Sequence, residues 1–405
     1  MLPLDDGLRQ LYNSPSMAEI PHTAPVSGVS VGARREGGFF FLAFVGCVLV
    51  FAALSLYLSP HVIDGDAVGY LQAVRVYQGE APQPQILPGQ NEVTLDVVTV
   101  HRMLTTPLGI QAVRLFSDFF GSDIVGWLAW DTILFFAVNI LFYFLLLRVF
   151  RSPRVAFVGG LFFAGNYSMV VHGLALFMDI GGWFFYILSI YCLFAYIESG
   201  KYRDLFFSAL AIAIGALFKE NALVAAIPLA AIVLYEDWRS PVRLLSRSVP
   251  LGLLVVIPLV IHHVSIYFQY GYTYLVWVKF TEDAYHYSSR LLEYVKSLGS
   301  LLTFLAPVTI LGAFAFVRPS PDSPLDMKRR IFIGAVLFSS LPAALWLAVT
   351  QRVLFMVVPG CVLLACVFIK RHERYWYAFL PVIALYVLSG FFMDSFILKA
   401  VNLPF

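Results

Sequence analysis

The sequence predicts an all-α polytopic membrane protein with about eleven transmembrane helices. Of its 405 residues, 60% are hydrophobic and 13% are charged, whereas an ordinary soluble domain is about 45–50% apolar and about 25% charged. A helix needs about 20 mostly apolar residues to cross the hydrocarbon core of a bilayer. Runs of this kind, each ended by Gly, Pro or charge, lie at roughly 39–59, 124–147, 155–172, 180–197, 205–218, 221–235, 248–265, 298–317, 331–349, 353–369 and 375–394.

The distribution of Lys and Arg predicts the orientation of these helices. With a cytoplasmic N-terminus, 18 of the 27 positive residues fall in inside segments, so the positive-inside rule favours an N-in, C-out topology. The first run follows Arg34 and Arg35 and lies too far from the start for a cleaved signal peptide. We therefore expect a disordered cytoplasmic tail (1–36), a single transmembrane domain (37–397) and a short outside tail (398–405).

Two long segments are expected outside the membrane, at 60–122 and 266–297. The first contains an amphipathic stretch, Val97 to Phe120, which is suited to helices lying in the membrane interface. The second holds a third of all the tyrosines. These aromatic residues are typical of an interfacial belt, and they would equally form a platform on which sugar rings or an isoprenoid pack.

Several classes of function are disfavoured by what the sequence lacks. Acidic and basic residues nearly balance, with a formal net charge of +2, which argues against a nucleic-acid partner. The four cysteines lie in apolar runs without a CxxC spacing, so we expect neither disulfides nor a thiolate metal site. No phosphate-binding loop, dinucleotide fingerprint or HExxH motif occurs. These absences disfavour ATP hydrolysis, nicotinamide chemistry and zinc proteolysis.

Candidate functional residues are the charged groups at or below the membrane surface, because burying a charge requires a partner or a water-filled cavity. Asp64 and Asp66 directly follow the first run as Asp64-Gly65-Asp66. This short motif would form a solvated turn, with Asp66 at or beside the N-cap of the next helix. The alternative is a pair of catalytic carboxylates or metal ligands.

Lys219 and Glu220 form the tip of a hairpin between two short apolar runs. Because these runs are short, we expect the tip to lie near or below the outer surface of the membrane. The two charges would neutralise each other there, or Lys219 would face a cavity and receive an anionic ligand. Asp179, in the short outside turn that begins at His172, suits an N-cap. Arg352 would either extend to lipid headgroups or bind a phosphate. Asp131 and the pair His262-His263 suit hydrogen bonds between helices.

The order of these residues resembles the membrane glycosyltransferases of the GT-C fold that use polyprenyl-phosphate sugars, including protein O-mannosyltransferases and lipid A aminoarabinose transferases. The acidic motif of the first outside loop appears as Asp64-Gly65-Asp66, and it continues with Tyr70, Arg75 and Gly79-Glu80, although Ala67 stands where the aminoarabinose branch has an acid. Further similar stretches are Leu217 to Leu223 with Pro228 and Tyr235-Glu236, Asp179 before an aromatic helix, and Gln351 to Phe355 with Pro359, where Val353 replaces the usual Tyr.

The resemblance implies an inverting transfer at the extracytoplasmic face of a bacterial inner membrane, from a polyprenyl-phosphate sugar to a lipid or glycan acceptor. No nucleotide is required at that face. Metal use stays open, and Asp64, Asp66 and Asp179 would hold a divalent cation if one is used. The rival interpretations are a transporter or flippase of a lipid-linked saccharide and a structural membrane subunit. The implied roles are general base for Asp66 with support from Asp64, phosphate binding for Lys219, Arg352 and Arg75, and acceptor or supporting roles for Asp179, Glu220, Tyr70 and His172.

Overall fold

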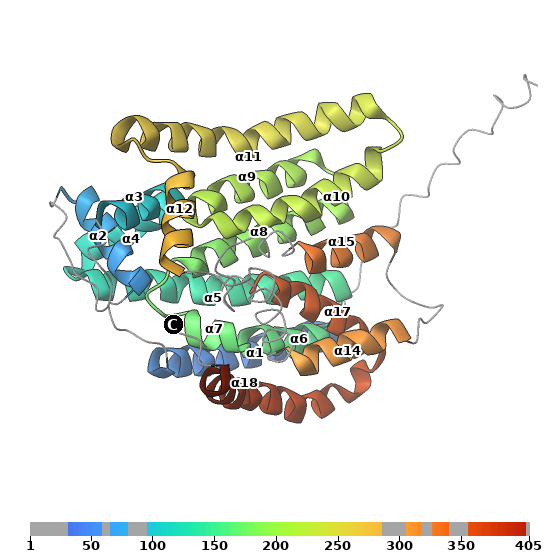
Figure 1. Ribbon diagram of the computed structural model, residues 1–405. Coiled ribbons are helices and arrows are strands. Elements are labelled where there is room, and N and C mark those ends of the chain that lie inside the picture. Colours follow the sequence, from blue (N-terminus) through green and yellow to red (C-terminus); the bar gives the residue numbers. More distant parts are fainter. Residues whose placement is uncertain are drawn as a thin grey trace, which may run out of the picture. The chain divides into compact units, whose positions relative to one another are not determined.

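The computed structural model describes residues 31–58, 65–79, 95–285, 305–317, 326–339 and 355–401, and all regular structure in these ranges is helical (Figure 1). Residues 1–39 and 40–405 form separate units, and the packing described below is that within the second. The helices are α1 (Val31–Leu58), α2 (Gly65–Tyr77), α3 (Leu95–Thr105), α4 (Pro107–Phe120), α5 (Asp123–Phe150), α6 (Pro153–Ala164), α7 (Tyr167–His172), α8 (Asp179–Ser199), α9 (Tyr202–Phe218), η2 (Glu220–Ala225), α10 (Ala226–Asp237), α11 (Pro241–Tyr270), α12 (Tyr274–Tyr285), α14 (Ala306–Val317), α15 (Met327–Phe338), α17 (Val357–Arg371), η4 (Glu373–Ala378) and α18 (Phe379–Val401).

The predicted all-α polytopic membrane fold is confirmed, and each of the eleven apolar runs overlaps a helix among the described residues. The helix α1 already begins at Val31, inside the segment expected to be a disordered tail. The number of crossings and their orientation stay predictions. Within the described ranges, four helical segments are long and apolar enough to cross a membrane, namely Arg35–Leu58, Asp123–Phe150, Asp179–Ser199 and Pro241–Tyr270.

The first outside segment folds into the three short helices α2, α3 and α4. The amphipathic stretch from Val97 to Phe120 is helical, as expected, but it is divided into α3 and α4 because Pro107 occupies the first turn of α4 and starts a new helix. The helix α4 buries Ile110 and Val113 and exposes Leu115 and Phe119. This two-sided pattern suits the predicted position in the membrane interface.

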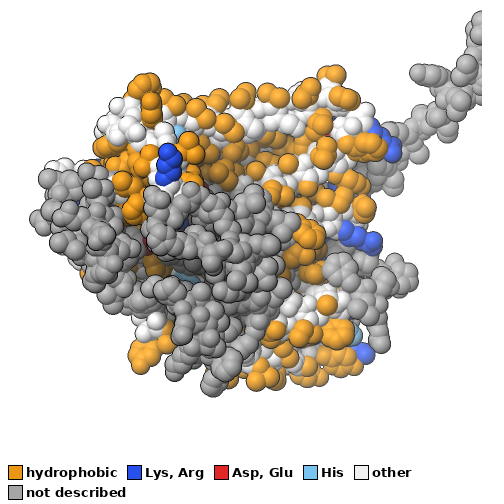
Figure 2. Space-filling model, in the orientation of Figure 1, with side chains coloured by type: hydrophobic (Ala, Val, Ile, Leu, Met, Phe, Trp, Pro, Cys, Tyr) orange, Lys and Arg blue, Asp and Glu red, His pale blue; other side chains and the backbone are white. Residues whose placement is uncertain are grey.

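The largest core lies among α5, α6, α8, α9 and α17, where aromatic side chains stack between helices. Trp183 stacks on Phe355 with ring centroids 4.0 Å apart, and Phe142 stacks on Phe163 at 4.1 Å. By contrast α11 is peripheral, and only 11% of its most apolar window is buried. Figure 2 shows mostly hydrophobic side chains along its visible face, as expected of a helix that faces lipid.

Close packing at several helix crossings depends on glycine, as is common in membrane bundles. A Cβ atom at Gly126 of α5 would lie 2.4 Å from the backbone nitrogen of Ser117 in α4, which is closer than real contacts allow. At Gly360 of α17 a Cβ would lie 2.4 Å from the Cα of Leu337 in α15. These glycines therefore set the separations between helices, and Gly126 sets the position of α4 on α5.

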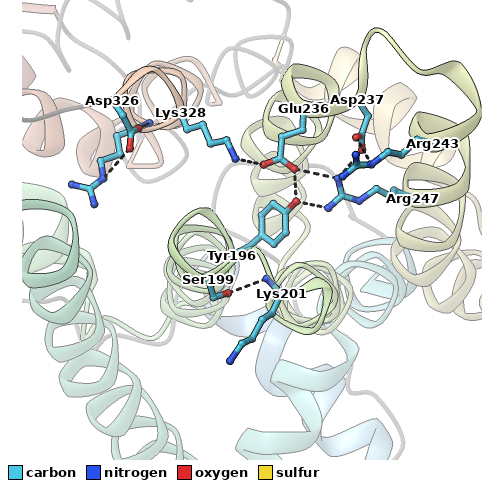
Figure 3. A network of polar contacts seen from close by, with 10 residues as sticks. Tyr196, Ser199, Lys201, Glu236, Asp237, Arg243, Arg247, Asp326 and Lys328 are labelled. Atoms are coloured by element: carbon cyan, nitrogen blue, oxygen red, sulfur yellow. Dashed lines mark hydrogen bonds and ion pairs between the residues drawn. The ribbon is translucent and has the colours of Figure 1, made fainter. Parts of the chain in front are cut away.

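At the end of α8 distant from Asp179, a polar network joins α8, α10, α11 and α15 (Figure 3). Arg247 lies 2.7 Å from Asp237 and 3.1 Å from Glu236, and Lys328 lies 2.7 Å from Glu236. The Tyr196 hydroxyl donates to Glu236 and accepts from Arg247. Burial raises the pKa of Glu236, but the bonds from Lys328, Tyr196 and Arg247 outweigh it and leave that pKa below its usual value.

A first prediction concerns the α4–α5 crossing. Gly126→Ala should lower the apparent melting temperature of the purified protein by several degrees, because the backbone of α4 must move and overpacking of this kind costs about 1–3 kcal/mol. The control is Gly46→Ala in α1, where a Cβ meets nothing within 4 Å and alanine favours the helix by up to about 1 kcal/mol. Equal melting temperatures for the two variants would contradict the assigned contact.

A second prediction concerns the network of Figure 3. Arg247→Met should destabilise the protein by about 1.5–3 kcal/mol, because it removes a charged hydrogen-bond donor from the buried carboxylate of Asp237, which keeps Arg243 as its second cation. Arg203→Met is the matched control, since its ion pair with Asp204 is exposed and such pairs contribute about 0–1 kcal/mol. Thermal denaturation in detergent compares the two, and a drop of similar size in both would show that the network adds nothing specific.

Candidate functional site

A carboxylate and a guanidinium meet where α2 packs on α3. Asp66, in the first turn of α2, forms a 2.5 Å ion pair with Nη2 of Arg102, and its side chain is 30% exposed whereas that of Arg102 is 8% exposed. The helices approach closely at Gly69, where a Cβ would lie 2.8 Å from Cγ1 of Val98 and 3.4 Å from Cγ of Arg102. The missing side chain at Gly69 therefore lets Arg102 reach across α2 to Asp66.

Tyr70, one turn after Asp66, connects this pair to a second buried cation. Its hydroxyl accepts a 2.6 Å hydrogen bond from Nζ of Lys219. The Arg102 guanidinium lies 4.8 Å and the Lys219 ammonium 5.4 Å from the centroid of the Tyr70 ring. Both distances suit cation–π attraction. One tyrosine thus holds two cations that would otherwise repel each other.

Lys219 is buried at the end of α9, beside the start of α8. Its Nζ lies 4.0 Å from Oδ1 of Asp179, the first residue of α8, whose N-cap is Met178 rather than Asp179. Burial lowers the pKa of Lys219, but the neighbouring Glu220, Tyr70 and Asp179 outweigh it and raise that pKa above its usual value. Lys219 is therefore a permanently charged cation inside the protein.

The absence of a side chain at Gly182 lets the segment that contains Lys219 and Asn221 lie against α8. A Cβ at this position would be 2.0 Å from Oδ1 of Asn221 and 2.9 Å from Cβ of Lys219. Both polar atoms of the Asn221 side chain are buried without a hydrogen-bond partner among the described residues, as is Oε2 of Glu220. Unsatisfied polar atoms of this kind cost free energy and are common where a ligand or water binds.

Aromatic side chains from the second outside segment close the other side of α3. His101 stacks on Trp277 with ring centroids 3.9 Å apart, and Arg102 lies 5.4 Å from the Trp277 centroid. Tyr272 is buried in the same cluster. Burial, together with the charges of Arg102 and Lys219, holds the pKa of His101 well below its usual value. The rings of His101, Trp277 and Tyr272 pack against other residues of the protein, whereas the side chain of Tyr267 is exposed.

The structure brings together four of the residues singled out in the sequence, namely Asp66, Tyr70, Asp179 and Lys219. Glu220 directly follows Lys219 in the chain. Asp64 and Arg352 lie outside the described residues. His172, at the end of α7, lies between the rings of Tyr167 and Phe177, with centroid distances of 6.3 and 6.2 Å.

Arg75 is not part of this cluster. It lies on α2 about 14 Å along the axis from Asp66 and on the opposite face, because nine residues correspond to two and a half turns. Its Nε is 3.6 Å from Oδ2 of Asp123, on the side where α2 faces α4 and α5. Its predicted role at the donor phosphate therefore lacks support from the geometry.

His262 and Asp131, for which the sequence suggests hydrogen bonds between helices, occupy different settings. Nε2 of His262 lies 3.0 Å from the carbonyl oxygen of Met103, a contact between helices of the expected kind. Asp131 is fully buried in α5 and interacts electrostatically with Asp179. Among the described residues it makes no hydrogen bond to another helix. Asp131 therefore adds a further carboxyl group below the Lys219–Asp179 pair.

Sequence reasoning missed Arg102 and His101 as members of the site. Arg102 is one of the nine positive residues that the predicted topology leaves outside the inside segments. The available signal was its position in a mostly apolar stretch (Val97 to Leu104), where a charge must find a partner. Its actual partner, Asp66, is 36 residues earlier in the chain.

The described residues offer no clear place for a metal ion. No group of three or more His, Cys, Asp and Glu side chains among them is arranged to hold one. Asp66 and Asp179 each face a cation of the protein, which opposes the binding of a further cation. These two carboxylates on their own therefore do not fit a divalent cation.

Comparisons with known proteins identify a family and a fold that this chain resembles. Residues 105–266 match the model of the dolichyl-phosphate-mannose-protein mannosyltransferase family. The structure is similar to the crystal structure of ArnT from Cupriavidus metallidurans bound to undecaprenyl phosphate, with a TM-score of 0.52 and 17% identity, covering 85% of this chain and 62% of that one. No curated protein matches significantly. The predicted resemblance is therefore confirmed: residues 105–266 match a glycosyltransferase family, within a chain that has the ArnT-like GT-C fold of polytopic membrane proteins.

Proposed function

We propose that this protein is an integral-membrane glycosyltransferase that moves a sugar from a polyprenyl-phosphate donor to a lipid or glycan acceptor. One observation carries this proposal: the buried cation Lys219 belongs to the same cluster as the more exposed carboxylate of Asp66. Transfer from a lipid phosphate needs a fixed positive charge for the leaving phosphate and a base for the acceptor hydroxyl. The family match and the ArnT-like fold support the same reaction class.

The predicted topology assigns this cluster to the outer side of the membrane. Asp179 begins α8 and the Tyr196 network lies near its other end, about 30 Å away for a helix of this length. The network contains Arg247 and Lys328, which the positive-inside rule assigns to the cytoplasm. We propose accordingly that the reaction occurs at the extracytoplasmic face of a bacterial inner membrane.

The chemistry is a single inverting displacement at the anomeric carbon. The acceptor oxygen forms a bond to that carbon while the bond to the phosphate oxygen breaks, and the hydroxyl proton passes to Asp66. Arg102 holds Oδ1 of Asp66 and so fixes the direction of the carboxylate. The polyprenyl phosphate leaves with an additional negative charge, which the ammonium of Lys219 stabilises at close range in a buried setting.

The remaining predicted residues complete the proposal as supporting groups. Arg352 supplies a second cation to the phosphate, and Asp64 supports Asp66. Asp179 positions Lys219. Together with Glu220 and His172, it lines the part of the site where the acceptor binds. No nucleotide and no metal ion takes part in the steps above.

A flippase or transporter of a lipid-linked saccharide is the main rival function. Its binding site is expected near the middle of the membrane, between two related halves of the chain. The described site residues instead gather where α2, α3, α8 and the end of α9 meet, and the sequence contains no internal repeat. Formation of a glycosylated product by the purified protein separates the two functions, because a flippase forms none.

The general-base assignment predicts that Asp66→Asn lowers the turnover number for transfer from a polyprenyl-phosphate sugar by about 10²–10⁴-fold, the usual contribution of a positioned base. Asp204→Asn, in the first turn of α9 at the other end of the bundle, is the matched control and should leave turnover unchanged. Product formation by purified, correctly folded variants is the measurement. Near-normal turnover of Asp66→Asn would refute the role of Asp66 as base.

The phosphate-binding assignment predicts that Lys219→Met lowers the turnover number by about 10²–10³-fold, as is typical when one group that stabilises a leaving charge is removed. Lys219→Arg should restore part of the activity, since it keeps the charge. Lys201→Met, an exposed lysine, is the control. If Lys219→Met raised only the KM for the acceptor and left the turnover number intact, the cation would not act on the phosphate.

A further inference from the structure

A polar hollow lies on the part of the protein formed by α2, α4 and the start of α5, away from the Lys219 cluster. Its volume is about 630 Å³, within the range of about 300–1,000 Å³ that is usual for ligand sites. Its walls are mostly polar, unlike those of most small-molecule sites. The lining residues are Arg75, Tyr77, Gln78, Arg114, Ser117, Asp118, Gly121, Ser122 and Asp123.

The charged side chains of this hollow are only loosely paired with each other. Nε of Arg75 is 3.6 Å from Asp123, and Nε of Arg114 is 3.9 Å from Asp118, both longer than a hydrogen bond. Arg114 donates one 2.9 Å bond to the carbonyl oxygen of Tyr77. A guanidinium has five N–H donors, so most of the donors of these arginines are available to a ligand.

Ser117 also lines the hollow. This residue is 2% exposed, and its Oγ is buried without a hydrogen-bond partner among the described residues. Oγ itself is therefore closed to a ligand, and the arginines, the aspartates and Gln78 are the groups that a ligand in the hollow would contact.

The mixture of charges identifies the chemical class of the ligand. The two arginines and the two aspartates give the hollow no net formal charge. A phosphate would be repelled by Asp118 and Asp123, and a cation by Arg75 and Arg114. An isoprenoid chain would leave all these groups unsatisfied. A sugar hydroxyl both donates and accepts hydrogen bonds, so a neutral saccharide satisfies carboxylates, guanidiniums and the amide of Gln78 together.

We propose that this hollow binds a neutral saccharide portion of the acceptor, at a site separate from the reacting centre. The proposal rests on the proposed glycosyltransferase function for the identity of the saccharide as acceptor. The helix α2 carries Asp66 in its first turn and Arg75 in its last, about 14 Å apart along the axis. This distance, with the two residues on opposite faces of α2, requires an acceptor longer than one sugar ring, so the acceptor is an oligosaccharide.

The surroundings of the hollow suit an acceptor that is attached to a lipid. The helix α4 that contributes Arg114 and Asp118 also exposes Leu115 and Phe119. Exposed apolar side chains next to charged ones are typical of a helix at the membrane interface. The saccharide of a membrane-anchored acceptor lies at that level.

Binding of the full-length protein in detergent micelles to an array of neutral, phosphorylated and sulfated oligosaccharides tests this inference. We expect binding to neutral oligosaccharides, and at least about a tenfold loss in the double variant Gln78→Ala/Asp118→Ala, whose residues are exposed and hydrogen-bonded to each other at 3.1 Å. Arg203→Gln, at the other end of the bundle, is the matched control and should bind like the wild type.

Three results would overturn the inference: equal binding by the double variant and the wild type, binding restricted to phosphorylated or sulfated members, and no binding to any member. The array does not depend on catalysis, so its outcome is separable from that of the transfer assay. If the double variant lost binding while Asp66→Asn transferred sugar normally, the saccharide site would stand and only the catalytic assignment of Asp66 would be rejected.

Discussion

The architecture of the site follows from the burial of a single cation, Lys219, in a largely apolar bundle. An ammonium removed from water costs several kcal/mol unless opposite charge and hydrogen bonds replace its hydration. Here Asp179 supplies the charge and the Tyr70 hydroxyl accepts the hydrogen bond. Tyr70 belongs to α2 and Asp179 to α8, so satisfying this one group fixes the first outside segment against the transmembrane helices. The same tyrosine lies under Arg102, which extends the arrangement to Asp66.

The sequence predicts the helices well because each crossing requires a long apolar run, and composition alone reveals such runs. It also locates Lys219, since a charge between two short apolar arms must remain near the membrane. It does not reveal Arg102, because the pairing of α2 with α3 depends on a close approach at Gly69 that only the folded chain shows. The position of Arg75 could have been found in the sequence: nine residues along a helix place it on the face opposite Asp66.

Both ends of the bundle are organised by charge, but in different ways. At the Tyr196 end, Glu236 and Asp237 are matched by cations across four helices. Oδ1 of Asp237 is buried without a hydrogen bond among the described residues, but it lies 2.9 Å from Arg243, so most of this charge is balanced within the protein. At the Lys219 end, buried polar atoms of Glu220 and Asn221 have no hydrogen-bond partner among the described residues. Saturated polar groups favour rigidity, whereas unsatisfied ones favour ligand binding.

The separation of Asp66 from Arg75 along α2 has a consequence for the product. A helix is a stiff spacer of fixed rise per residue, so an acceptor held in the hollow would present a sugar to Asp66 at a set number of rings from the held one. Because these two residues also lie on opposite faces of the helix, such an acceptor would have to pass around α2, and an acceptor of one or two rings could not occupy both places at once.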